Sequence, residues 1–221
     1  MSDPGWSAVD EYIVGKLIGE DGALETALAN NRQAGLPPID VSLAQGKMLQ
    51  LLARAVAAKR ILEIGTLGGY SAISLARALS EDGVLVTLEL EPEYAAVARA
   101  NVDHAGVGHR VDIRIGPACD TLAEMCSDGE AAFDFVFIDA DKDNYPAYLD
   151  YAIQLSRPGT MLIFDNVVRQ GEVINPQSGD PKVAGTRALY DALKDNPKID
   201  ATAIQTVGSK KWDGFLLALV Q

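Results

Sequence analysis

Short apolar strands and helical segments alternate along the chain from residue 60 to residue 164. Apolar runs predict strands over 60–65, 84–90, 111–115, 133–138 and 161–164, and helical patterns fill the intervals over 71–79, 92–105, 118–125 and 145–155. The run over 133–138 is apolar almost throughout, which is typical of a strand covered on both faces. Repeated strand–helix units predict a doubly wound α/β fold around a mostly parallel sheet.

The segments that flank this alternation complete the expected fold. Apolar residues at helical spacing predict an N-terminal helix over 7–31, which ends before Pro37, and a second helix over 42–57. The Arg157-Pro158-Gly159 sequence is expected to close the helix over 145–155.

The C-terminal part predicts a loop over 167–181, a helix over 183–193 and two strands over 201–207 and 212–220. The link between the two strands is too short for a parallel crossover, so we expect an antiparallel final strand in a seven-stranded sheet. The chain is therefore predicted to be one domain over 1–221, with an N-terminal helical cap over 1–57 and a core over 58–221.

Charge and cysteine content restrict the partners and the compartment. The 221 residues carry a formal net charge of -12, which disfavours nucleic acid and anionic membranes as partners. Cys119 and Cys126 match neither a common zinc pattern nor a disulfide scaffold, which favours a reducing compartment. No apolar run approaches the ~20 residues that span a bilayer, and the N-terminus lacks a signal-peptide pattern. We expect a cytoplasmic protein.

A glycine-rich turn, EIGTLGGYS over 63–71, follows the first strand, and Glu89 ends the second. An acid at that place can accept hydrogen bonds from a ribose. The turn departs from the dinucleotide pattern G-x-G-x-x-G because Thr66 and Leu67 separate Gly65 from the next glycine, and Glu63 would repel a pyrophosphate. The pattern thus favours S-adenosylmethionine, which has no phosphate. A structural turn beside a solvated Glu89 is the alternative.

Polar side chains follow the fourth and fifth strands. FDFVFIDADKDNY places Asp139, Asp141 and Lys142 after the fourth strand, and MLIFDN places Asp165 and Asn166 after the fifth. Because neighbouring parallel strands end at one edge of a sheet, these side chains can converge. Carboxylate and amide oxygens suit Mg²⁺, Ca²⁺ or Mn²⁺, and the open positions of such an ion fit a diol. Acids can also follow buried strands simply because the chain reaches the surface there.

The sequences LEIGTLGGYS and FIDADKDNY, together with Glu89 and the Asp165-Asn166 pair, resemble the cation-dependent caffeoyl-CoA and catechol O-methyltransferases. The resemblance extends from about Val41 to the C-terminus. It implies a Rossmann-like methyltransferase fold, a homodimer, and methyl transfer from S-adenosylmethionine to a hydroxyl of a small phenolic, catechol-like vicinal diol. Gln170 replaces an asparagine of the plant enzymes, and the WDG sequence over 212–214 is more similar to bacterial members.

The resemblance also assigns roles to residues. It implies that Asp139, Asp165 and Asn166 bind a divalent cation, with Mg²⁺ favoured, and that Lys142 acts in catalysis together with Asp139, as a base or as an electrostatic guide. The cofactor positions are Val41, Glu63, Gly65, Thr66, Ser71, Glu89, Ala118, Asp139 and Asp141.

Two other functions remain open from the sequence. A nicotinamide-dependent oxidoreductase would share the fold and Glu89, but it would lack a suitable phosphate turn and leave Asp139 and Asp165 unexplained. A non-catalytic metal- or nucleotide-binding module would leave Lys142 unexplained. Arg169 and Gln170 are the candidates for substrate selection.

Overall fold

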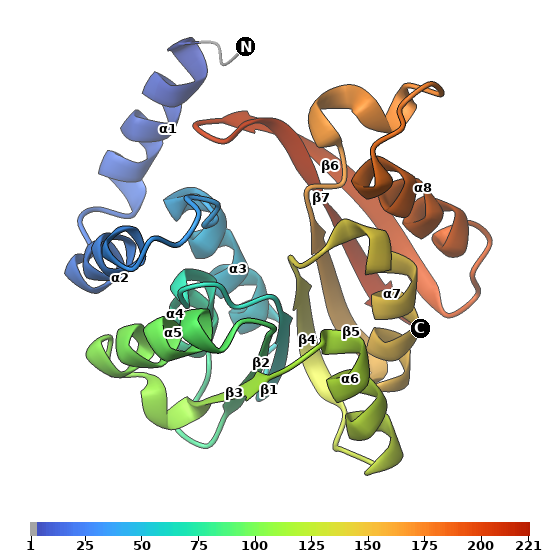
Figure 1. Cartoon of the computed structure of the whole chain (residues 1–221), viewed down its shortest axis with the longest axis horizontal. Helices are drawn as coiled ribbons and strands as arrows, with labels where there is room; N and C mark the ends of the chain where they lie inside the picture. The colour runs from blue at the N-terminus through green and yellow to red at the C-terminus, as the bar shows by residue number, and fades with distance from the viewer. Residues whose placement is uncertain (1–3) are drawn as a thin grey trace.

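The computed structural model describes residues 4–221, and a seven-stranded sheet forms its centre (Figure 1). The strand order is β3-β2-β1-β4-β5-β7-β6, and only β7 runs antiparallel to its neighbours. The strands are β1 (Arg60–Ile64), β2 (Val84–Glu89), β3 (Val111–Ile115), β4 (Phe133–Ile138), β5 (Ser156–Asp165), β6 (Ile199–Gly208) and β7 (Lys211–Val220). The predicted doubly wound fold and its antiparallel final strand are confirmed.

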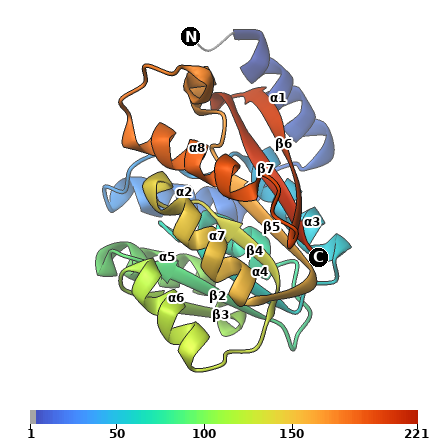
Figure 2. The same ribbon diagram turned by 90° about the vertical axis from the view of Figure 1, so that its right-hand side faces the viewer.

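Helices cover both faces of the sheet (Figures 1 and 2). They are α1 (Pro4–Leu17), α2 (Gly22–Gln33), α3 (Leu43–Ala55), α4 (Tyr70–Ala76), α5 (Pro92–His104), α6 (Ala118–Ser127), α7 (Tyr145–Gln154) and α8 (Pro181–Leu193). Three short 3₁₀ helices are η1 (Gly108–Arg110), η2 (Lys142–Asn144) and η3 (Arg169–Ile174). Within residues 4–221, none of the helices has the length and apolar character that a membrane crossing requires.

The central strand β4 shows how the sequence builds two cores. Successive side chains of a strand point to opposite faces of the sheet. Val136 and Ile138 accordingly pack with the core under α6, α7 and α8, whereas Phe135 and Phe137 pack with the core under α3 and α4. All four side chains are buried, so the uninterrupted apolar run of β4 follows from its position between two helical layers.

The prediction of a single N-terminal helix over 7–31 is wrong. The structure has two helices, because Gly19 adopts a left-handed backbone (φ 76°) after α1 and Asp21 begins α2 as its N-cap. The Asp21 carboxylate accepts a hydrogen bond from the backbone N–H of Leu24 (3.2 Å), which satisfies a donor that a helix start leaves free.

Arg157-Pro158-Gly159 does not form the expected turn after α7. It lies within β5, which begins at Ser156, in register with Phe133 of β4. The Thr160 hydroxyl donates to the carbonyl oxygen of Phe133 (2.6 Å) and fixes this irregular start. The predicted loop over 167–181 is likewise not irregular throughout, since it contains η3 and ends in the first residue of α8.

Asp134 joins the starts of β1, β4 and β5. Its Oδ2 accepts hydrogen bonds from the backbone N–H groups of Lys59 (2.8 Å) and Arg60 (3.0 Å), and its Oδ1 accepts from Arg157. Burial raises the pKa of Asp134, but the two N–H groups and Arg157 outweigh burial, so its pKa lies below the usual value. The resulting stability is present above the pKa of the unfolded state and is lost as the pH falls through the folded value.

We therefore expect Asp134→Asn to lower the free energy of unfolding by about 1 kcal/mol at pH 7, since hydrogen bonds to a charged acceptor are the stronger ones. The difference from the parent should shrink below about pH 4, where carboxylates protonate. Urea denaturation at both pH values measures it, with Asp150→Asn on exposed α7 surface as the control. A variant as stable as the parent at pH 7 would show that this junction contributes nothing.

Candidate active site

A cleft of about 630 Å³ opens at the carboxyl edge of the sheet, a size that suits a small-molecule site. It lies beyond the ends of β1, β2, β4 and β5, and the segment before α3 closes one side with Pro37, Ile39 and Val41. The structure brings most of the predicted site residues together there: Val41, Gly65, Thr66, Ser71, Glu89, Ala118, Asp139, Asp141, Lys142 and Asn166 line the cleft. Glu63 and Asp165 do not line it and are buried beside it.

Gly65 makes the close approach between β1 and β4 possible. Its backbone is left-handed (φ 99°), and a Cβ atom there would lie 2.4 Å from the carbonyl oxygen of Asp139. Only glycine fits a position with that conformation and that neighbour. The two strand ends therefore meet at the floor of the cleft.

Glu89 ties the glycine-rich turn to the end of β2. Its Oε2 accepts hydrogen bonds from the backbone N–H groups of Leu67 (2.7 Å) and Thr66 (3.3 Å), and its Oε1 accepts from Glu91 (3.0 Å). The side chain is buried, so the alternative of a solvated acid is wrong. Each carboxylate oxygen has two lone pairs, which leaves Glu89 able to accept further hydrogen bonds from a ligand in the cleft.

Glu63 is fully buried under the same turn. Its Oε2 accepts a hydrogen bond from the Thr87 hydroxyl (2.6 Å), whereas its Oε1 has no hydrogen-bond partner among the described residues. Burial, with a smaller contribution from the charges of Asp139 and Glu89, raises the pKa of Glu63 to about 7. A buried carboxyl group beside the cleft, with one oxygen free of hydrogen bonds, suits a ligand that carries positive charge and no phosphate.

Asp139 and Asp165 follow the paired strands β4 and β5, in which Ile138 is in register with Phe164. The Lys142 ammonium donates to Asp139 Oδ1 (2.6 Å), an ion pair in which the Lys142 side chain is buried. Asp165 is buried as well, and burial together with the negative charge of Asp139 raises its pKa to about 7. Two carboxylates that repel one another at a buried edge favour a bound cation.

Lys142 keeps its positive charge in this setting. Burial by itself would lower the pKa of Lys142, but the neighbouring Asp139 outweighs burial and raises the pKa above the usual value. Tyr145 lies beneath the ammonium, with its ring centroid 5.3 Å from Nζ. The Tyr145 hydroxyl donates to the backbone carbonyl of Asp165 and so links the start of α7 to the end of β5.

Three contacts at the site were not among the predicted ones. Gln45 of α3 donates its amide to Asp165 Oδ2 (2.6 Å) from 120 residues away along the chain. Tyr148 and Asn144 both donate to Asp141. The tyrosine and asparagine stand within a few residues of Asp141, so helical spacing could have indicated them, whereas nothing local indicates Gln45.

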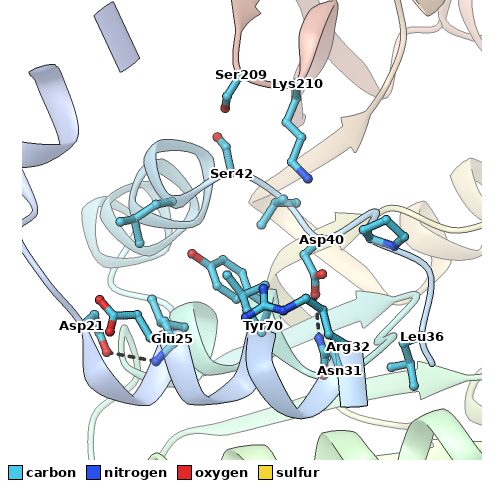
Figure 3. Close-up of a pocket in the computed structure, with 15 residues that line it drawn as sticks. Asp21, Glu25, Asn31, Arg32, Leu36, Asp40, Ser42, Tyr70, Ser209 and Lys210 are labelled. Atoms are coloured by element: carbon cyan, nitrogen blue, oxygen red, sulfur yellow. Dashed lines mark hydrogen bonds between the residues drawn. The ribbon is translucent and has the colours of Figure 1, made fainter. Parts of the chain in front are cut away.

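A smaller cavity, of about 340 Å³, lies on the other side of the segment before α3 (Figure 3). It is bounded by α2, by Tyr70 and by Ser209 and Lys210 from the turn between β6 and β7. Asp40, Val41 and Tyr70 line both cavities, so this segment forms a common wall. Asp40 accepts a hydrogen bond from the Asn31 amide (2.8 Å), drawn in Figure 3, which anchors the wall to α2.

The predicted metal ligands are two carboxylates and one amide. Within residues 4–221, there is no group of three or more His, Cys, Asp or Glu side chains suited to a metal ion. The set of Asp139, Asp165 and Asn166 is not such a group, because its third member is an asparagine. All three side chains offer oxygen ligands, which Mg²⁺ and Ca²⁺ prefer.

Comparisons with known proteins agree with this fold and cleft. The O-methyltransferase family model matches residues 20–219. A catechol O-methyltransferase from Niastella koreensis is 48% identical over 221 residues, which cover 100% of both chains. An O-methyltransferase from Bacillus cereus, solved in complex with SAH, is 52% identical with a TM-score of 0.96 and covers 98% of this chain and 99% of its own.

A third relative is an O-methyltransferase from Streptomyces achromogenes, involved in tomaymycin synthesis and solved in complex with SAM. It is 47% identical with a TM-score of 0.96 over 100% of this chain and 99% of its own. The chain belongs to the O-methyltransferase family. The predicted family and the predicted enzyme class are confirmed, and the oxidoreductase and the non-catalytic module are not supported.

Proposed function

We propose that this protein transfers a methyl group from S-adenosylmethionine to one hydroxyl of a small aromatic vicinal diol, with the help of a divalent cation. The observation that carries the proposal is the convergence of Asp139, Lys142, Asp165 and Asn166 in or beside the cleft that also holds the Gly65 turn and Glu89. The names of the relatives support it, since one is a catechol O-methyltransferase and two are bound to SAM or SAH.

The cofactor end of the cleft is built from β1 and β2. Glu89 would accept hydrogen bonds from the ribose hydroxyls, and Gly65 and Thr66 would allow backbone contact. Glu63, Asp141 and the other acidic groups nearby favour the positively charged parts of the cofactor. Val41, Ser71 and Ala118 complete the wall. S-adenosylmethionine, when bound, supplies an activated methyl group on a sulfonium.

Glu89→Gln should weaken the binding of S-adenosylmethionine at least about tenfold, because it removes a charged acceptor and turns an amide donor toward N–H groups. Isothermal titration calorimetry measures the dissociation constant. Glu93→Gln, on the exposed surface of α5, removes the same charge outside the cleft and should leave binding unchanged. Equal affinities of the parent and Glu89→Gln would remove Glu89 from the cofactor site.

At the other end, Asp139, Asp165 and Asn166 would hold the cation, with Mg²⁺ favoured and Ca²⁺ or Mn²⁺ chemically compatible. A bound divalent cation lowers the pKa of an attached hydroxyl and orients a diol. Gln45 holds Asp165 by its amide, and Asp139 holds Lys142. The Lys142 ammonium then stabilises the negative charge of the attacking oxygen, and positioning by these side chains lowers the barrier further.

The acceptor assay tests this function. Label from methyl-labelled S-adenosylmethionine should pass to catechol and not to phenol, which lacks the second hydroxyl. Binding of the cofactor without methyl transfer to any diol would overturn the proposed acceptor class, and absence of cofactor binding would overturn the proposed reaction.

We also propose that the chain forms a homodimer in the cytoplasm. Several large apolar side chains of α1 are exposed, among them Leu17 (77%) and Tyr12 (68%). Both cysteines are unpaired thiols, which favours a reducing compartment. Apolar residues gathered on one exposed helix favour burial against a second copy. Sedimentation equilibrium should give twice the chain mass for the parent and the single mass for a Tyr12→Glu, Leu17→Glu variant. A monomeric parent would refute the dimer.

A further inference from the structure

Two cationic side chains line the cleft without an acidic partner. Lys142 is paired with Asp139, but Arg169 and Lys182, which also line the cleft, form no salt bridge with any residue of the part of the chain that is described. Arg169 Nε is buried and has no hydrogen-bond partner there. A buried unpaired donor is destabilising unless a ligand satisfies it.

Both cations belong to the end of the cleft that holds Lys142. Arg169 begins η3, three residues after Asn166, and Lys182 lies in the first turn of α8. Helix α8 packs directly on η2, since a Cβ atom on Gly185 would lie 2.2 Å from the carbonyl oxygen of Lys142. Glu89, on β2, is separated from Asn166 by three strand spacings, or roughly 14 Å. The two cations therefore lie at the proposed acceptor end of the cleft and not at the proposed ribose end.

The backbone at Arg169 is held in an unfavourable conformation. Arg169 and Gln170 both have a left-handed backbone (φ 55° and 54°), a conformation that residues other than glycine rarely adopt. Asp213 Oδ1 fixes the turn by accepting hydrogen bonds from the N–H groups of Val168 (3.1 Å) and Arg169 (3.0 Å). Strained backbone that its surroundings enforce is typical of ligand-binding positions. The backbone of Arg169 is thus fixed by contacts within the chain and needs no ligand to adopt this conformation.

We propose that the natural acceptor is an aromatic vicinal diol that carries a carboxylate, and that Arg169, assisted by Lys182, binds this carboxylate. The inference rests on the proposed function and narrows its substrate class. A guanidinium can donate two parallel hydrogen bonds to a carboxylate, which gives orientation as well as affinity. The exposed Lys182 adds positive charge at the same rim. A carboxylate bound there would set the orientation of the diol in the cleft.

The test compares 3,4-dihydroxybenzoate with its near-isosteric amide, 3,4-dihydroxybenzamide, in the full-length protein. For each protein the acid-to-amide ratio of the two kcat/KM values is measured, together with the acid-to-amide ratio of the two association constants in the presence of SAH. We expect the parent to favour the acid, and Arg169→Gln to lower both ratios at least about tenfold, the usual effect of one lost charge-assisted hydrogen bond. Lys182→Gln should lower them less.

Arg54→Gln is the matched control, because Arg54 is exposed on α3 and lines neither cavity. It makes the same change in net charge and should leave the ratios unchanged. Arg169→Lys should retain part of the preference, which a loss of local folding would not allow. Equal ratios in the parent and Arg169→Gln, with catechol still methylated by the parent, would overturn this inference alone. If the parent methylates no diol, the proposed function itself fails.

Discussion

Asp165→Ala is expected to abolish methyl transfer while the protein still binds S-adenosylmethionine. Asp165 supplies one of two carboxylates at the acceptor end of the cleft, and its removal leaves Asp139 and Asn166 as the remaining oxygen donors for the cation. The cofactor end is built from β1 and β2, so it should not depend on a side chain at the end of β5. Turnover measured with labelled cofactor and calorimetry on the same samples separate the two effects.

The folded state of this variant needs its own measurement. Asp165→Ala leaves the Gln45 amide and the Asn166 N–H without their acceptor, but it also relieves the repulsion from Asp139. Thermal unfolding followed by circular dichroism shows whether the chain remains folded. Asp191→Ala, an exposed position on α8, serves as the control. Loss of cofactor binding in a folded variant, or turnover close to that of the parent, would contradict the assignment of Asp165 to the acceptor end.

Lys142→Met should lower kcat by about 10²-fold or more, the usual range for groups that handle a proton or its charge in the transition state. Methionine keeps much of the buried volume but removes the ammonium beside Asp139. Lys142→Arg keeps the charge, so it should recover part of the rate if Lys142 acts through its charge. Recovery would not follow if Lys142 had to accept a proton, because arginine stays protonated.

Steady-state kinetics with catechol measure both variants, with KM and kcat determined separately. We expect the loss to appear in kcat, since the ammonium acts on the attacking oxygen. Near-parent kcat in Lys142→Met would remove Lys142 from the chemistry and leave it as a buried partner of Asp139.

The sheet and the floor of the cleft could be predicted because local patterns encode them. The apolar run of β4 identifies a strand buried on both faces, and Gly65, Glu89, Asp139 and Asn166 stand at strand ends where a parallel sheet gathers ligands. The sequence pattern is sufficient to predict these site residues, because the topology of a parallel sheet by itself brings the strand ends together.

Other features depend on contacts between distant segments and could not be predicted. The hydrogen bond between Gln45 and Asp165 joins α3 to β5. The turn at Arg169 is held by hydrogen bonds to Asp213 in β7. The break between α1 and α2 was missed because apolar spacing continues across it, whereas the capping by Asp21 and the left-handed Gly19 decide where the helices end. Patterns of apolar residues thus indicate which helices and strands form, whereas capping and packing decide at which residues they begin and end.

Dependence of methyl transfer on a divalent cation tests the central claim most directly. Transfer of label from S-adenosylmethionine to catechol is measured with Mg²⁺, with EDTA, and with EDTA followed by excess Mg²⁺. We expect turnover with Mg²⁺, its loss with EDTA and its return when Mg²⁺ is restored, because Asp139, Asp165 and Asn166 would act on the acceptor through the ion. Turnover that proceeds at the same rate in EDTA would contradict it.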